Sequence, residues 1–187
     1  MSTFRGFIAV EIPSNKKIQD LENAITQTQA NVKLVELHNI HITLKFLGDV
    51  PDHLTESIEK IMVSSVQNMK TFQLTLGNTG VFPNTNYMKI LWIGIQDNNT
   101  LSAIASALEK GLEPLGFPKE KRTFSPHLTL GRVRTAEHKD KLIAVLERYA
   151  HEQFGEYTIN AIQLKKSDLT PKGPIYTTIK TVKFSEG

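Results

Sequence analysis

Hydrophobic residues recur along this chain in two spacings, one typical of strands and one typical of helices. β-Branched, aromatic and aliphatic residues predict extended segments at 7–12, 32–35, 40–47, 72–76, 88–95, 123–133, 157–164 and 175–184. Apolar residues three or four apart predict helices over 18–25, 54–62, 101–112 and 136–154. Residues 81–84 and 168–174 are rich in turn formers and are predicted as connections. The pattern therefore predicts about eight strands and four helices.

The order of these segments predicts the fold class. Helices and strands are interspersed, and several strands follow one another directly. This order favours antiparallel sheets with helices on one face over a doubly wound parallel sheet. No linker or low-complexity segment divides the 187 residues, a length that suits one domain or two packed lobes. We therefore expect an α+β fold.

One short pattern occurs twice in the chain. Residues 39–44 read Asn-Ile-His-Ile-Thr-Leu and residues 125–130 read Ser-Pro-His-Leu-Thr-Leu, so the two histidines are 127 − 41 = 86 positions apart. A spacing close to half of the chain suggests an internal duplication of a small αβ unit. Two such units would face each other about a pseudo-twofold axis.

Strand alternation divides each copy into a polar and an apolar face, because residues i and i+2 point the same way. His41 shares a face with Thr43, and His127 shares one with Thr129. The apolar residues of the two copies are predicted to point the opposite way: Ile42, Leu44, Phe46, Leu128 and Leu130. Side by side, the two strands would place two imidazoles and two hydroxyls around one small polar groove. Such a group suits a phosphate held between a general base and a general acid.

Composition and charge exclude several other kinds of functional site. The chain has no cysteine, which excludes disulfides, thiolate nucleophiles and cysteine-based metal sites. Lys and Arg number 22 against 19 Asp and Glu, and a net charge of +3 permits an anionic substrate without requiring nucleic acid. The sequence shows no signal peptide and no run of about 18 apolar residues, so we expect a cytoplasmic protein that does not enter the membrane.

A metal site is the other chemical interpretation of paired histidines. Neither copy has a nearby carboxylate or a third histidine on the same strand face, so we discount it. His53, His138 and His151 lie among charged neighbours in predicted helices and are expected at the surface.

Five segments carry a family resemblance: 5–10 (RGFIAV), 39–48 (NIHITLKFLG), 115–118 (LGFP), 124–133 (FSPHLTLGRV) and 173–176 (GPIY). With them the chain resembles the two-histidine (2H) phosphoesterases, whose mark is two His-x-Thr-x motifs. It is most similar to their RNA 2′,3′-cyclic phosphodiesterase branch, historically named 2′-5′ RNA ligase. The resemblance implies one bilobal domain over 1–187, with two antiparallel sheets, helices on the outer faces and a positively charged central cleft. It also implies a monomer without metal or cofactor.

The resemblance further implies the reaction and its residues. The substrate would be RNA ending in a 2′,3′-cyclic phosphate, including tRNA fragments, or a small cyclic nucleotide, and the product a 2′-phosphomonoester. The sequence pattern around the two histidines does not show which is the acid and which is the base. The resemblance assigns His41 as the acid to the leaving O3′ and His127 as the base to water.

Other residues are expected to hold the substrate. Thr43 and Thr129 would donate hydrogen bonds to the non-bridging oxygens. Arg132 matches a phosphate-contacting position of the family. Strict alternation from the second histidine would point it away from the groove, so its reach requires a bulge or twist that Gly131 provides. Phe7 and Arg5 are expected to stack on or pair with the terminal nucleotide, and a core role is the alternative for Phe7.

Two further functions stay open. Small antiparallel sheets also form RNA-binding modules without chemistry, although aromatic residues make up only 7% of this chain and no RNP-like aromatic run is present. The same histidine pair would also serve the joining of RNA ends, which reverses the hydrolysis.

Overall fold

A computed structural model describes residues 2–185 of the chain. Over these residues it has nine strands and four α-helices. The strands are β1 (Thr3–Glu11), β2 (Val32–Leu34), β3 (His41–Pro51), β4 (Phe72–Asn84), β5 (Tyr87–Gln96), β6 (His127–Val133), β7 (Gln153–Ile159), β8 (Ala161–Thr170) and β9 (Gly173–Lys183). The helices are α1 (Lys16–Gln27), α2 (Thr55–Val66), α3 (Thr100–Leu112) and α4 (Lys139–Arg148). Short 3₁₀ turns cover Leu37–Asn39, Asp52–Leu54 and Glu113–Leu115.

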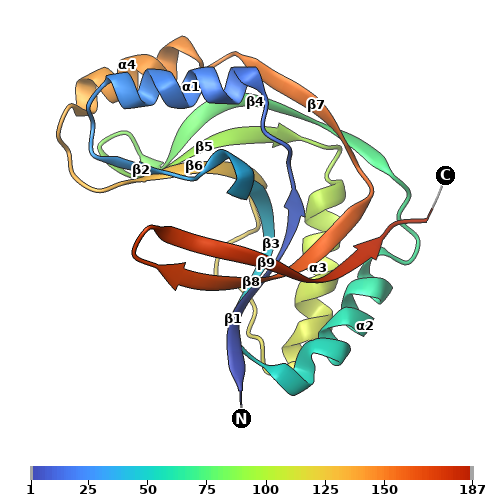
Figure 1. Cartoon of the computed structure of the whole chain (residues 1–187). Helices are drawn as coiled ribbons and strands as arrows, with labels where there is room; N and C mark the ends of the chain where they lie inside the picture. Colours follow the sequence, from blue (N-terminus) through green and yellow to red (C-terminus); the bar gives the residue numbers. More distant parts are fainter. Residues whose placement is uncertain (1, 186–187) are drawn as a thin grey trace.

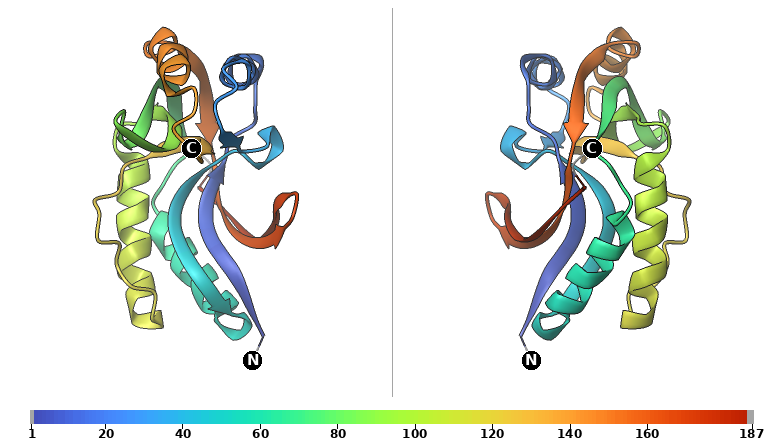
Figure 2. Two further views of the ribbon diagram at one scale, coloured as in Figure 1. Left: turned by 90° about the vertical axis from the view of Figure 1, so that its left-hand side faces the viewer. Right: turned by 90° about the vertical axis from the view of Figure 1, so that its right-hand side faces the viewer.

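All strands join one curled antiparallel sheet in the order β7-β4-β5-β6-β3-β1-β8-β9, with β2 added beside β6. The helices cover this sheet in two pairs (Figure 1). Helices α2 and α3 pack together against β9 and β3, whereas α1 and α4 pack together against β2 and β4. Figure 2 shows the two pairs at separate ends of the molecule. The predicted α+β class, with antiparallel strands and helices on the outside, is confirmed.

The two halves of the sheet meet between β3 and β6. These strands pair in antiparallel register through Ile42 and Leu128. Both side chains are fully buried in the core. The two repeated motifs therefore lie next to each other at the centre of the sheet.

A bulge interrupts β3 and β6 at equivalent positions. Opposite β1, Thr43 and Lys45 occupy consecutive pairing positions, so Leu44 is the extra residue. Opposite β5, Thr129 and Gly131 do the same, so Leu130 is the extra residue. An extra residue reverses which of the following side chains face the core.

The first bulge corrects one expectation. Phe46 was predicted to share the core face with Ile42 and Leu44, but its side chain is 61% exposed. The bulge turns it outward beside Phe7, with the two ring centroids 6.3 Å apart. Lys45 turns inward instead, where its ammonium donates to the carbonyl oxygen of Pro118 at 2.6 Å and pairs with Glu109.

Two boundaries differ from the prediction in the first half of the chain. Residues 81–84 were predicted as a connection, yet they end β4 and pair with β5 as far as Asn84 and Tyr87. Pro83 fits this strand because it lies beside a register shift, where the regular ladder of hydrogen bonds is interrupted. The strand predicted over 123–133 begins only at His127.

The second half departs further. The helix predicted over 136–154 is confined to Lys139–Arg148, because Phe154 is fully buried within β7. The strand predicted over 157–164 is two strands that separate at Asn160, and these lie in different halves of the sheet. The connection predicted over 168–174 shrinks to residues 171–172, because β8 and β9 pair as far as Thr170 and Gly173.

Glu22 generates a prediction about stability. Its side chain lies on the buried face of α1 with 9% exposed, and Oε1 has no hydrogen-bond partner among residues 2–185. Burial raises the pKa of this carboxyl to about 7. Between the ordinary glutamate pKa and about 7, the unfolded chain loses its proton while the folded chain keeps it. The free energy of unfolding should therefore fall by about 3 kcal/mol as pH rises through that window.

Glu22→Gln removes this titration. In urea denaturation at pH 5 and pH 8, the variant should lose clearly less stability between the two pH values than the parent. Glu156→Gln, at an exposed strand position, is the matched control and should behave as the parent. Equal pH dependence in Glu22→Gln and the parent would contradict the assignment.

Candidate active site

The repeated histidines and threonines converge at the junction of the two half-sheets. His41 is the first residue of β3 and His127 the first of β6. One step from the Ile42–Leu128 pair, antiparallel order sets His41 beside Thr129 and Thr43 beside His127. All four side chains are half-buried. The structure thus brings together the four residues that the repeated motif singled out.

Each histidine is oriented by a backbone carbonyl two residues earlier. His41 Nδ1 lies 2.7 Å from the carbonyl oxygen of Asn39, and His127 Nδ1 lies 2.7 Å from that of Ser125. A carbonyl only accepts, so Nδ1 is the donor and carries a hydrogen in both rings. Nε2 is left to exchange protons with a substrate. The sequence pattern did not reveal these anchors, because every residue has a carbonyl.

Aromatic rings enclose His41. The Phe7 ring centroid lies 4.9 Å from that of His41, and Tyr176 of β9 approaches His41 edge-on at 5.3 Å. Phe7 is only 4% exposed. Its ring therefore supports the imidazole and has little surface left for stacking on a base. Sequence reasoning did not assign Tyr176 to the site, although residues 173–176 carried part of the family resemblance.

Two charged side chains oppose each other around His41. Burial lowers the pKa of the His41 imidazole, and the hydrogen bond to the Asn39 carbonyl opposes this shift. The Lys165 ammonium lowers the pKa further, whereas the Glu11 carboxylate raises it. Lys165 and Glu11 also form an ion pair with each other.

His127 has a different aromatic wall. Phe82 meets the His127 ring edge-on, with ring centroids 5.1 Å apart. The Trp92 ring centroid lies 5.3 Å from that of Phe82. Gly80 makes room for the indole, because a Cβ at that position would lie 2.2 Å from a Trp92 ring carbon. Trp92 pairs across from Thr129 in the sheet. The second motif therefore rests on an aromatic pair from β4 and β5.

The bulge in β6 reverses the alternation of side chains after Leu130, and Arg132 therefore lies on the same face of the strand as His127 and Thr129. Gly131 is required beside it, since a Cβ there would lie 2.8 Å from the carbonyl oxygen of Lys33 on β2. Arg132 and Arg5 both lie near the Tyr176 hydroxyl. Burial raises the pKa of that phenol, and the two guanidinium groups lower it. Cations from both halves of the sheet thus converge beside His41.

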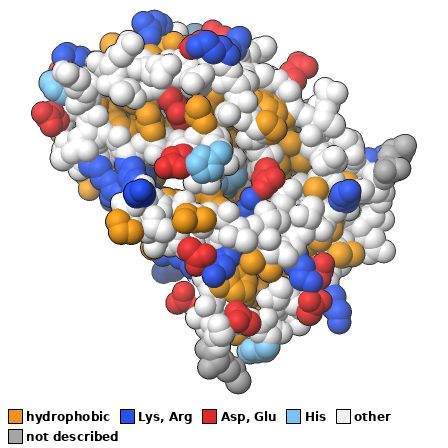
Figure 3. Space-filling model, viewed as in Figure 1, with side chains coloured by type: hydrophobic (Ala, Val, Ile, Leu, Met, Phe, Trp, Pro, Cys, Tyr) orange, Lys and Arg blue, Asp and Glu red, His pale blue; other side chains and the backbone are white. Residues whose placement is uncertain are grey.

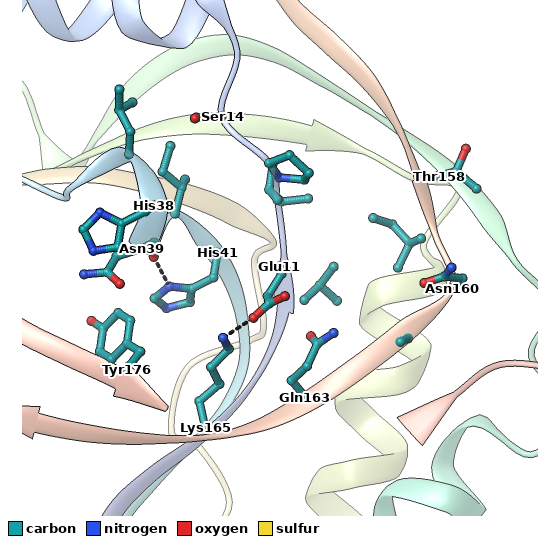
Figure 4. Close-up of a pocket in the computed structure, with 17 residues that line it drawn as sticks. Glu11, Ser14, His38, Asn39, His41, Thr158, Asn160, Gln163, Lys165 and Tyr176 are labelled. Atoms are coloured by element: carbon teal, nitrogen blue, oxygen red, sulfur yellow. Dashed lines mark hydrogen bonds and ion pairs between the residues drawn. The ribbon is translucent and has the colours of Figure 1, made fainter. Parts of the chain in front are cut away.

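A cavity of about 650 Å³ opens beside His41 (Figure 4). His41 and Tyr176 lie at one end, and the Glu11–Lys165 ion pair crosses its middle. The remaining lining is in large part apolar, and it also has five polar, uncharged residues: Ser14, Asn39, Thr158, Asn160 and Gln163. Gln163 Oε1 is buried and has no hydrogen-bond partner in the part of the chain that the structure describes. A lining of this kind suits a neutral ligand rich in hydrogen-bonding groups.

The remaining histidines lie outside the site core. His53 and His151 are exposed, and His138 is half-buried at the start of α4.

Within residues 2–185, no three or more His, Asp or Glu side chains are grouped as metal ligands. Over the same residues, no helix has the length and apolar character to cross a membrane.

Comparison with known proteins gives consistent matches. Residues 10–170 match the family model described as the 2′-5′ RNA ligase superfamily. A Methanocaldococcus jannaschii protein named RNA 2′,3′-cyclic phosphodiesterase is 40% identical over 176 residues, which cover 94% of this chain and 98% of that protein. A protein of the same name from Methanothermobacter thermautotrophicus is 32% identical over 182 residues, with coverage of 96% and 98%.

Solved structures share the fold. The protein TT0787 of Thermus thermophilus aligns with a TM-score of 0.78 at 27% identity and covers 96% of this chain and 97% of its own. E. coli LigT complexed with 3′-AMP aligns with a TM-score of 0.72 at 21% identity, covering 98% and 99% of the two chains.

The charges around His41 generate a prediction. Lys165→Met should raise the pKa of His41, because the cation disfavours the imidazolium, and Glu11→Gln should lower it, because the carboxylate favours the imidazolium. The His41 Hε1 chemical shift, followed by NMR against pH, measures the pKa directly. Shifts of His41 in the same direction in both variants would contradict the electrostatic account.

Proposed function

The chain belongs to the 2′-5′ RNA ligase superfamily, and from that membership we propose that it is an RNA 2′,3′-cyclic phosphodiesterase. Its substrate is the 2′,3′-cyclic phosphate of an RNA end, including the end of a tRNA fragment, or of a small cyclic nucleotide. Hydrolysis of this cyclic phosphate gives a 2′-phosphomonoester. One observation carries the proposal. Two imidazoles, both anchored through Nδ1, lie on adjacent central strands, and each lies beside the threonine of the other motif. Relatives of 32–40% identity over nearly the whole chain have names that agree.

The two histidines share the proton transfers. His127 Nε2 takes a proton from water as the water oxygen attacks phosphorus. The bond from phosphorus to O3′ breaks, and protonated His41 donates its Nε2 proton to O3′. The phosphate remains attached to O2′. Both proton transfers use side chains of this chain, so the mechanism needs no metal or cofactor. The acting unit is one bilobal domain over 1–187, as a monomer.

The other side chains hold the phosphate in line. Thr43 and Thr129 donate hydrogen bonds to the non-bridging oxygens and stabilise the charge that grows on them in the transition state. Arg132 pairs with the same oxygens, because a guanidinium offers two parallel donors. Arg5 adds a second cation beside Tyr176.

The direction of the reaction places the nucleoside. In-line attack puts the leaving O3′, and the ribose that carries it, on the side of the acid. With His41 as the acid, the terminal nucleoside lies toward the cavity of about 650 Å³. Its uncharged polar lining, including the unpaired Gln163 oxygen, suits the base and ribose.

Ligation of RNA ends is the second candidate, favoured by the description of the matching family. It would use the same histidines in the same roles. The 5′-hydroxyl of another RNA end would replace water: His127 takes its proton as its oxygen attacks phosphorus, the bond from phosphorus to O3′ breaks, and His41 protonates O3′, which leaves a 2′-5′ linkage.

The histidine pair gives the first test. His41→Ala and His127→Ala should each lower kcat/KM about 10²–10⁴-fold on an RNA ending in a 2′,3′-cyclic phosphate, because each removes one proton transfer. Circular dichroism should show that both variants stay folded. His53→Ala, at an exposed position, is the matched control. Near-normal turnover in either active-site variant, or loss of parent activity in EDTA, would overturn the two-histidine mechanism.

The product gives the second test. If His41 protonates O3′, every product end carries a 2′-phosphate, which ³¹P NMR distinguishes from a 3′-phosphate. The profile of kcat/KM against pH should be bell-shaped, because one imidazole must be neutral and the other protonated. A 3′-phosphate product would reverse the assignment of acid and base. Joined RNA in place of hydrolysed ends would favour ligation.

A further inference from the structure

A second cavity opens on the side of the site away from His41. It has a volume of about 350 Å³ and lies between the β4–β5 hairpin and the end of β6. We call it the basic groove, defined by Asn86, Tyr87, Lys89, Arg132, Arg134 and Lys139. Four of these six residues are cations, and none of the groove's lining residues is acidic. In the space-filling view, Lys and Arg side chains gather on the left, near the ends of β2 and β6 (Figure 3).

The walls of the basic groove are tied together. Lys139, the first residue of α4, donates a hydrogen bond from Nζ to the carbonyl oxygen of Asn86 in the hairpin turn, at 3.2 Å. Lys89 holds its ammonium 4.9 Å from the centroid of the Tyr87 ring. Tyr87 is nevertheless 62% exposed. The hairpin therefore presents an accessible aromatic ring and a cation at the same place.

Arg132 connects the groove to the active site. It lines the groove and also lies near the Tyr176 hydroxyl, beside His41. A path lined by cations therefore leads from Arg132 to the hairpin tip. The RNA backbone leaves the terminal ribose at O5′, on the His41 side, and reaches this path by turning back past Arg132. A bound mononucleotide has only one phosphate group for this path. A longer RNA has a further phosphate at each nucleotide.

We propose that the basic groove binds the backbone of single-stranded RNA upstream of the terminal cyclic phosphate, with Tyr87 stacking on a base. The inference rests on the proposed function and names the part of the substrate that the catalytic residues do not hold. Cations without competing carboxylates bind successive phosphates by releasing counterions. An exposed aromatic ring adds stacking that tolerates any base. This combination suits single-stranded RNA better than an acidic protein, which offers no flat bases.

The test compares a short and a long ligand of the same chemistry. The substrates are 2′,3′-cyclic AMP and a single-stranded RNA of about ten nucleotides that ends in a 2′,3′-cyclic phosphate, long enough to run past the groove. Lys89→Ala combined with Arg134→Ala should raise KM for the RNA about tenfold, as should Tyr87→Ala. The kinetics on cyclic AMP should stay unchanged. Lys139 is left intact because it ties the walls together.

Binding of the product RNA, ending in a 2′-phosphate, tests the groove without relying on turnover. Fluorescence anisotropy should show that the double variant reduces the slope of log Kd against log salt by about 1.4, the expected value for two lost phosphate contacts to a single strand. Lys60→Ala combined with Lys110→Ala removes the same charge from exposed sites on α2 and α3, and should bind RNA as the parent does.

The outcomes separate the two proposals. Unchanged RNA affinity and salt slope in the double variant would overturn the groove assignment, as would an equal loss on cyclic AMP and RNA. Competition by polyglutamate as strong as competition by RNA would assign the groove to acidic proteins instead. If the parent turns over neither substrate, the proposed function fails, while product-RNA binding still decides the role of the groove.

Discussion

The site depends on one backbone pairing, between Ile42 and Leu128. Among the described residues, it is the one place where β3 and β6 are paired, and it joins the two halves of the sheet. Both side chains are fully buried, so each half holds its strand through its own core. Because side chains alternate along a strand, burial of these two residues sends the neighbouring His and Thr residues to the opposite face. The same contact therefore joins the two halves of the sheet and brings the His and Thr residues together.

The same bulge occurs in β3 and β6 but presents a different side chain in each half of the sheet. The third residue after each histidine, Leu44 or Leu130, is the extra residue of a bulge. In both strands the bulge turns outward the residue five positions after the histidine. In one half that residue is Phe46, and in the other it is Arg132. The repeated motif thus keeps the same bulge and presents a different side chain after it, an aromatic ring in one half and a guanidinium in the other.

This asymmetry distinguishes the surroundings of the two histidines. His41 packs against Phe7 and Tyr176 and borders a cavity lined by apolar and uncharged polar residues and by the Glu11–Lys165 ion pair. Beyond His127, the strand leads through Arg132 to a groove lined by cations. A nucleic acid end has both kinds of surface, a neutral nucleoside and a charged backbone. We propose that the two cavities serve these two parts. Arg132 lines the basic groove and lies near Tyr176, which lines the cavity beside His41.

The sequence by itself determined the features that depend on local periodicity. The repeated His-x-Thr pattern and its apolar partners other than Phe46 follow from which residues alternate along a strand. The need for a bulge near Gly131 follows from the same alternation once the family resemblance assigns Arg132 to the phosphate. Most helices and strands were located for the same reason. The family resemblance rested on these same short segments.

Only the tertiary structure decided the features that depend on partners distant in the chain. Residues 81–84 form a strand because β5 pairs with them, and the strand predicted over 157–164 divides at Asn160 because its two parts join opposite halves of the sheet. The carbonyl anchors of the histidines are backbone atoms that every residue possesses. Tyr176 reaches His41 only because β9 folds back over the site. None of these contacts leaves a periodic signal, because each is made between segments that chain folding alone brings together.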